Sequence, residues 1–181
     1  MENSTIENAS PSREPPSKEE IVKQVIELQK NWPEYVAKQT PQFILELYEK
    51  NLLRLEINNE GKIMAVLYVQ PLDKSISIDN PNQIFRIGGL ASSPSTSGTK
   101  ALIKIVRQLE KEALEKKWNI IGRTDNPIIA KYLKKLGMEE LTFEECKRKY
   151  EKFLNLYLET SSKEDKNQYL NKTFYIHQAT F

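Results

Sequence analysis

The sequence is poor in cysteine and histidine. Its 181 residues include one cysteine, Cys146, and one histidine, His177. A lone cysteine excludes an internal disulfide framework, and this pair provides too few ligands for a His/Cys zinc site. The scarcity also argues against Ser-His-Asp or Cys-His catalysis, because the single histidine near the C-terminus would have to serve as the base. We therefore expect no metal, and chemistry that uses carboxylates, tyrosines, water or backbone groups.

The chain also lacks an excess of charge of one sign and any long apolar run. Its 27 basic and 25 acidic residues give a net charge of +2, too balanced for a dedicated nucleic-acid-binding protein. No apolar run approaches the roughly 20 residues of a membrane-spanning helix, and the N-terminus has no apolar signal core. We therefore expect a cytoplasmic protein with no nucleic-acid partner and no membrane partner.

Residues 1–16 are polar, rich in serine and proline, and without hydrophobic periodicity, so we expect a disordered N-terminal tail. Residues 17–181 are expected to form a single domain. Helices are indicated by the capping box of Ser17 and Glu20, by a Thr-Pro start at 40–41, and by a second capping box before a long C-terminal helix. Strands are predicted, in chain order, at residues 53–57, 62–69, 84–90, 119–123 and 173–181.

A loop rich in serine and glycine, residues 92–99, leads from the strand at 84–90 into a helix predicted at about 99–117. This order places free backbone N–H groups and the positive end of a helix dipole at one point. We therefore expect the loop to bind a phosphorylated ligand, the alternative being an ordinary connection. Gly88 and Gly89 interrupt the strand, which indicates a bulge or the close approach of a ligand, or else a simple bend.

The loop sequence SSPSTSGTKAL, residues 92–102, aligns with the pattern V-x-P-x-x-R-G-x-G-x-G/A. Pro94 and Gly98 match this pattern. Ser97 replaces its basic residue, and Lys100 replaces the first of its two later glycine or small positions. Leucine occupies the second of them.

A second pattern, N-x5-h-Y-x2-L-G-F with h apolar, aligns with residues 126–138. Asn126 and Gly137 match, while Leu133 replaces the tyrosine and Met138 the phenylalanine. Together with the order of the elements, the two motifs resemble the GNAT superfamily of acyl-CoA-dependent N-acyltransferases. The resemblance covers roughly residues 53–141.

The resemblance implies an α/β fold with a mixed, mostly antiparallel sheet flanked by helices, to which this chain adds a C-terminal helix and strand. It implies acetyl-CoA or another acyl-CoA as co-substrate, and a primary amine on a small molecule, protein or peptide as the acceptor that attacks the thioester directly. The residues implied in CoA binding are Leu90, Ala91, Ser92, Ser97, Gly98, Thr99, Lys100, Ala101 and Asn126.

Two residues have alternative interpretations. Asn126 resembles the asparagine beside the pantetheine arm, and it is also a suitable N-cap before Pro127. Tyr132 is the nearest phenol able to protonate the departing thiolate, but it lies one residue before the position of the family's tyrosine. One residue turns a helix by roughly 100°, which favours a packing role for Tyr132.

The general base is not evident. The strand that often carries a glutamate in the family has Arg86 instead, and the remaining candidates are Glu56, Glu60 and Asp79. Because the motifs are degenerate, two other functions stay open. One is a catalytically inactive binding or assembly module. The other is a transferase for a longer acyl chain on CoA or a carrier protein, accommodated beside Gly88.

The aromatic-rich region at 142–181 either packs in the core, forms a lid over the acceptor, or forms a homodimer surface.

Overall fold

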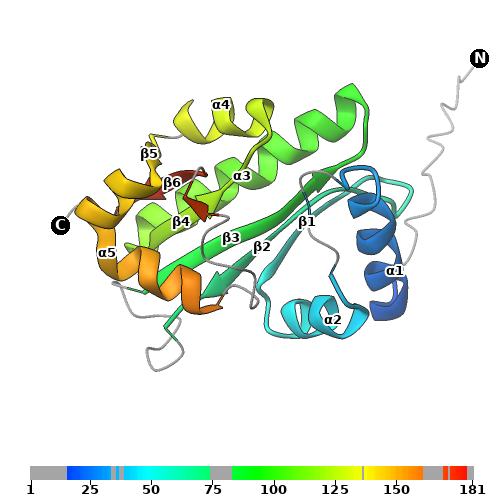
Figure 1. Ribbon diagram of the computed structural model, residues 1–181. Helices are drawn as coiled ribbons and strands as arrows, with labels where there is room; N and C mark the ends of the chain where they lie inside the picture. Colours follow the sequence, from blue (N-terminus) through cyan, green and yellow to red (C-terminus); the bar gives the residue numbers. More distant parts are fainter. Residues whose placement is uncertain are drawn as a thin grey trace, which may run out of the picture.

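A computed structural model describes residues 16–33, 36, 39–73, 83–135, 137–160, 169–170 and 172–178. Its strands are β1 (Leu53–Ile57), β2 (Ile63–Pro71), β3 (Ile84–Ser92), β4 (Asn119–Arg123), β5 (Glu139–Thr142) and β6 (Thr173–His177). They form one six-stranded sheet in the order β1-β2-β3-β4-β6-β5 (Figure 1). All neighbouring strands are antiparallel except β3 and β4, which run parallel. The mixed, mostly antiparallel sheet predicted from the sequence is confirmed.

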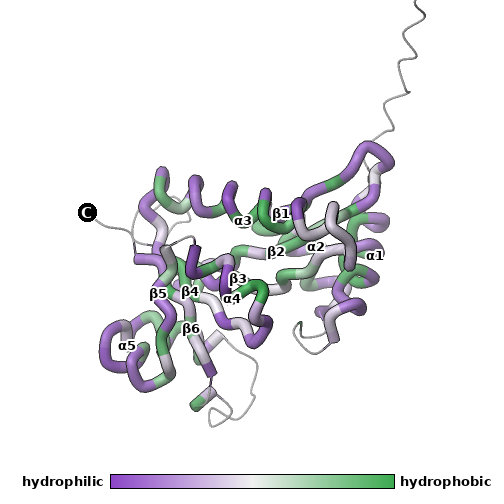
Figure 2. Tube along the Cα trace, turned by 90° about the horizontal axis from the view of Figure 1, so that it is seen from above, coloured by the Kyte–Doolittle hydropathy of each residue, from purple (hydrophilic) through white to green (hydrophobic). Residues whose placement is uncertain are grey.

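Helices cover both faces of this sheet. They are α1 (Lys18–Gln29), α2 (Pro41–Glu49), α3 (Thr96–Lys116), α4 (Pro127–Lys135) and α5 (Phe143–Thr160). Along β3, Phe85 and Ile87 pack with α3 and α4, whereas Ile84 packs with α5 on the opposite face. Helix α1 shares that opposite face, because its apolar side packs on Val66 and Ala91. In Figure 2 the helices alternate between hydrophobic and hydrophilic residues, as expected for helices that cover a sheet.

The predicted helix starts are confirmed at the N-terminal ends of α1, α2 and α5. Ser17 Oγ accepts the N–H of Glu20 at 3.2 Å, and a threonine caps α2 in the same way. At α5 the capping box is reciprocal. Thr142 Oγ1 accepts the N–H of Glu145 at 3.2 Å, while Glu145 Oε2 accepts the N–H of Thr142 at 2.9 Å. These helix starts were predicted correctly because a cap depends on residues only three positions apart.

Two elements differ from the sequence-based expectation. Helix α3 begins at Thr96 rather than at about Thr99, because Ser95 acts as its N-cap. Strand β5 was not predicted. It has four residues and is held by pairing with β6, which inserts between β4 and β5. Pairing between strands that are distant along the chain leaves little local signal.

The C-terminal aromatics mainly fill the core on the α5 face. Tyr157, Tyr169 and Phe174 are buried there, and the ring centroids of Tyr157 and Phe174 lie 5.5 Å apart. Core packing is therefore confirmed for these residues. No helix in the described ranges is long and apolar enough to cross a membrane. The tail at 1–15, the loop at 74–82 and the linker at 161–168 lie outside the described residues.

Candidate active site

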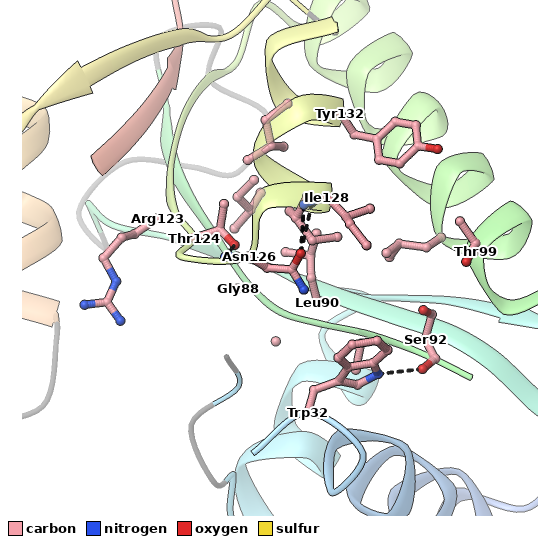
Figure 3. A pocket seen from close by; sticks show the side chains of 16 residues that line it. Trp32, Gly88, Leu90, Ser92, Thr99, Arg123, Thr124, Asn126, Ile128 and Tyr132 are labelled. Carbon is pink, nitrogen blue, oxygen red and sulfur yellow. Dashed lines mark hydrogen bonds between the residues drawn. The ribbon is translucent and has the colours of Figure 1, made fainter. Parts of the chain in front are cut away.

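The parallel pairing of β3 and β4 is short, and a cavity opens where it ends. The paired residues run from Ile84 opposite Asn119 to Ile87 opposite Gly122. Beyond this point β3 continues to Ser92, while β4 ends after one more residue. Between the two strands lies a cavity of about 90 Å³, shown in Figure 3. One edge of β3 therefore borders this cavity instead of a neighbouring strand.

The cavity collects residues from five parts of the chain. The described residues that line it are Trp32, Ile87, Gly88, Gly89, Leu90, Ala91, Ser92, Thr99, Leu102, Arg123, Thr124, Asn126, Ile128, Ile129, Tyr132 and Leu133. Arg123 is the only charged side chain among them. No carboxylate lines the described part of the wall, so the general base that the sequence did not reveal is not found there either.

The two glycines of β3 form the predicted irregularity. The register with β2 shifts between Val66 and Tyr68, and Gly89 has a φ of 61°. The ring of Tyr68 explains why glycine is needed here. A Cβ at Gly88 would lie 2.4 Å from Tyr68 Oη, and one at Gly89 would lie 2.7 Å from Tyr68 Cδ1. The ring of Tyr68 thus occupies the positions that side chains at Gly88 and Gly89 would take, while both glycines also line the cavity.

Trp32 closes the cavity at the end of β3. It follows α1 in the chain, and its indole N–H donates to the carbonyl oxygen of Ser92 at 2.7 Å (Figure 3). This bond ties the segment after α1 to the last residue of the strand. Sequence reasoning missed Trp32, because a contact between residues 60 positions apart leaves no local pattern.

Three serines contact one another at the start of α3. Ser95 Oγ accepts the N–H of Gly98 at 3.0 Å and lies 3.0 Å from Ser97 Oγ and 3.3 Å from Ser93 Oγ. Gly98 is buried, and a Cβ there would lie 2.1 Å from the carbonyl oxygen of Ser93. The glycine of the loop motif therefore lets the helix start approach the preceding backbone closely.

The predicted loop residues occupy different surroundings. Thr99 lines the cavity, whereas Ser97 is exposed in the first helical turn. Lys100 is exposed on α3 beside a separate hollow that Lys104 also lines. Ala101 is buried in the core between α3 and the sheet. Of the predicted CoA-binding residues, the structure brings together Leu90, Ala91, Ser92, Thr99 and Asn126 around one cavity.

Asn126 both caps α4 and lines the cavity. Its Oδ1 accepts the N–H of Ile128 at 2.9 Å and that of Ile129 at 3.4 Å (Figure 3). The residue is 8% exposed. The predicted N-cap is confirmed, and it leaves the amide nitrogen of Asn126 as the group able to donate to a ligand.

Tyr132 and Leu133 both line the cavity, on the α4 side. Tyr132 is half-buried, and its ring extends toward α3 over a groove of about 280 Å³ between the two helices (Figure 3). Leu133, which occupies the position of the family's tyrosine, is 2% exposed and packs in the core. Tyr132 is therefore a wall residue rather than a packing residue alone.

The candidate bases lie elsewhere. Glu56, on β1, pairs with Lys104 of α3 at 2.5 Å. Glu60 lies in the turn after β1 and is exposed, and Asp79 lies outside the described residues. Arg86 stacks on the ring of Tyr157 at 4.8 Å, on the face of the sheet that α5 covers. None of the described candidates lines the cavity.

No family model matches this chain. No curated protein sequence matches it significantly. Solved structures do match. Rv2747 from Mycobacterium tuberculosis, in complex with CoA, is 16% identical, with 88% of this chain and 94% of that chain covered and a TM-score of 0.59. Diaminobutyrate acetyltransferase EctA from Paenibacillus lautus, in complex with L-2,4-diaminobutyric acid and CoA, is 12% identical, with 93% and 94% covered and a TM-score of 0.55.

N-acetylglutamate synthase from Neisseria gonorrhoeae, complexed with CoA and N-acetyl-glutamate, is 11% identical, with a TM-score of 0.60. Here 93% of this chain is covered but only 35% of the synthase chain, so the match spans about a third of that protein. The shared architecture is a mixed, mostly antiparallel sheet between helices, and by this likeness the chain has the GNAT fold.

Proposed function

We propose that this chain is a divergent GNAT-type N-acyltransferase that moves an acetyl group from acetyl-CoA to a primary amine. The observation that carries this proposal is the edge of β3 that borders the cavity beyond Ile87. The pantetheine arm of CoA contains amides in an extended chain. Such a chain extends a strand edge through main-chain hydrogen bonds, as an added peptide strand does. The likeness to structures that hold CoA supports the same ligand here.

The phosphates of CoA are assigned to the start of α3. The first turn of a helix leaves backbone N–H groups without intrahelical partners and carries the positive end of the helix dipole. Ser95 accepts the N–H of Gly98, which leaves those of Thr96 and Ser97 for a pyrophosphate. Lys100, one turn further along α3, adds a positive charge in place of the basic residue that the loop lacks.

The proposed chemistry is direct attack of a neutral amine on the thioester carbonyl. The new C–N bond forms as the C–S bond breaks, and the backbone of Leu90 to Ser92 polarises the carbonyl oxygen. No described lining residue is a carboxylate, so water accepts the proton that the amine nitrogen loses as the amide forms. The leaving thiolate takes a proton from Tyr132 or from water, and the products are the amide and CoA.

A second candidate, a module that binds CoA without turnover, is favoured by one observation. The position expected to carry the acid holds Leu133, which is apolar and 2% exposed. Binding and turnover therefore need separate measurements.

Calorimetry with acetyl-CoA tests the proposal, with Ile128→Asp as the perturbation. Ile128 lines the cavity and is 57% exposed, so a polar residue there is tolerated by the fold. A carboxylate at this place removes apolar contact and repels the ligand's phosphates, and we expect at least about a tenfold loss of affinity that salt reduces.

The matched control is Leu114→Asp. Leu114 is 56% exposed on α3 and does not line the cavity, so the same change should leave affinity unchanged. No binding of acetyl-CoA by the unmodified chain at millimolar concentration would refute the proposal. Binding without thiol release on any amine of a broad panel would select the binding module instead.

A further inference from the structure

One residue that lines the cavity, Arg123, carries a positive charge. Arg123 is the last residue of β4 and lies just past the final pair between β3 and β4. Side chains along a strand alternate between the two faces of the sheet. Arg123 therefore lies on the same face as Ile121, which packs with α5. Among the described lining residues it is the only ionised side chain.

Arg123 is set among aromatic side chains. Its guanidinium carbon lies 5.3 Å from the centre of the Tyr169 ring. Burial raises the pKa of the Tyr157 hydroxyl, and the positive charges of Arg86 and Arg123 oppose that rise. The Tyr169 ring on one side of the guanidinium leaves its N–H groups available for hydrogen bonds.

Nearby carboxylates do not neutralise this charge within the described ranges. Asp125, two residues further on, binds Lys172 Nζ at 2.8 Å. No described ion pair involves Arg123. A partly buried guanidinium is stabilised by a planar anion that accepts two parallel hydrogen bonds, and a carboxylate has that shape.

The anion that meets Arg123 is distinct from the phosphates assigned to α3. In Figure 3 Arg123 lies at one end of the lining and Thr99, near the start of α3, at the other. The acceptor must approach the thioester from the end that the CoA chain does not fill, which is the end of Arg123. A group on the acceptor is therefore placed against the guanidinium.

We propose that the acceptor is an amine that carries a carboxylate, with an amino acid as the simplest case, and that Arg123 binds the carboxylate. This inference rests on the proposed acyltransferase function and adds the chemical class of its acceptor. Trp32, at the end of β3, contributes an apolar wall beside the same cavity.

The test uses the common amino acids that have a primary α-amine and no thiol, together with their primary amides, as acceptors, with acetyl-CoA and detection of the released thiol. The amide's amine is less basic than that of the parent acid, so more of it is neutral near pH 8. A preference for the acid therefore reports recognition of the carboxylate and not amine reactivity. We expect at least one acid to react, with kcat/KM at least about tenfold above that of its amide.

Arg123→Gln should lower kcat/KM for the acid by about 10- to 100-fold and the amide's value much less, so that the preference for the acid is lost. Arg123→Lys should restore part of the preference, because it keeps the charge without the planar fork. Arg148→Gln is the matched control: this arginine is exposed on α5, and both acceptors should react as before. If Arg123→Gln fails to fold, the preference of the unmodified chain decides alone.

The outcomes separate the two proposals. Three results would overturn the carboxylate site but not the acyltransferase function. The chain could turn over acids and amides equally, it could turn over only amines that lack a carboxylate, or Arg123→Gln could lower kcat/KM equally for both acceptors. A chain that neither binds nor consumes acetyl-CoA would overturn both. Unchanged CoA affinity in Arg123→Gln, measured by calorimetry, would assign its effect to the acceptor side.

Discussion

The steric role of Gly98 leads to a quantitative prediction for Gly98→Ala. The added Cβ would lie 2.1 Å from the carbonyl oxygen of Ser93 and 2.8 Å from its carbonyl carbon. Real Cβ atoms essentially never approach closer than 3.0 Å, so the two backbone segments must separate by about 0.9 Å. The obstacle is backbone, and unlike a flexible side chain it has no alternative rotamer.

Existing hydrogen bonds oppose this separation. The N–H of Ser93 donates to Met64 of β2 at 2.8 Å, which fixes one side. On the other side, Ser95 accepts the N–H groups of Gly98 and Thr99, both at 3.0 Å. Overpacking costs about 1–3 kcal/mol, and we expect the upper half of that range because both sides are anchored. For a chain of this size this lowers Tm by roughly 4–12 °C.

The assay combines urea unfolding with calorimetric titration of CoA. A shift of about 0.9 Å at the start of α3 misaligns the N–H groups assigned to the pyrophosphate, so CoA affinity should fall at least about tenfold. Gly137→Ala is the control. Its φ of 75° predicts a backbone cost of about 1–2 kcal/mol, no heavy atom lies within 4 Å, and CoA affinity should not change. A Gly98→Ala protein with unmodified stability and affinity would refute the steric role and the placement of the phosphates.

Two further predictions concern stability and reactivity. Burial alone raises the pKa of Glu112, but hydrogen bonds and charge from Arg54 and a neighbouring lysine outweigh it and hold that pKa below 4.5. Arg54→Gln should therefore lower the free energy of unfolding by about 1 kcal/mol at pH 7. This loss is fully present above pH 4.5 and disappears as the pH falls through the lowered pKa of Glu112. Urea unfolding at pH 7 and pH 3 measures it, and an equal cost at both values would contradict the ion pair. Burial raises the pKa of the Cys146 thiol to about 12, so a thiol reagent at pH 8 should label the chain in urea but not the native protein. Rapid native labelling would show that Cys146 is accessible.

Much of the fold was predictable from local patterns. The capping residues Ser17, Thr142 and Asn126 each marked a helix start that the structure confirms. The bulge in β3 was likewise visible from Gly88 and its neighbour. Such signals depend on residues within one turn or one strand, so a single sequence contains them completely.

The site was predictable only where its residues follow the strand-loop-helix order. Leu90, Thr99 and Asn126 were expected at a ligand and line one cavity. Trp32 and Arg123 were not expected, although Arg123 ends a predicted strand. Both reach the cavity through packing between segments that are far apart in the chain, and periodicity carries no information on such contacts.

The sequence by itself determined the order of elements, the helix caps and the resemblance to an acyl-CoA-dependent family, because each of these depends on short-range spacing. The tertiary structure alone decided what the residues face. It placed the ring of Tyr68 over the glycines of β3 and a Ser93 carbonyl against Gly98. It also brought Arg123 to the wall of the cavity where β3 and β4 stop pairing. Side-chain environment follows from how the sheet and helices pack, and that packing joins parts of the chain that no local pattern connects.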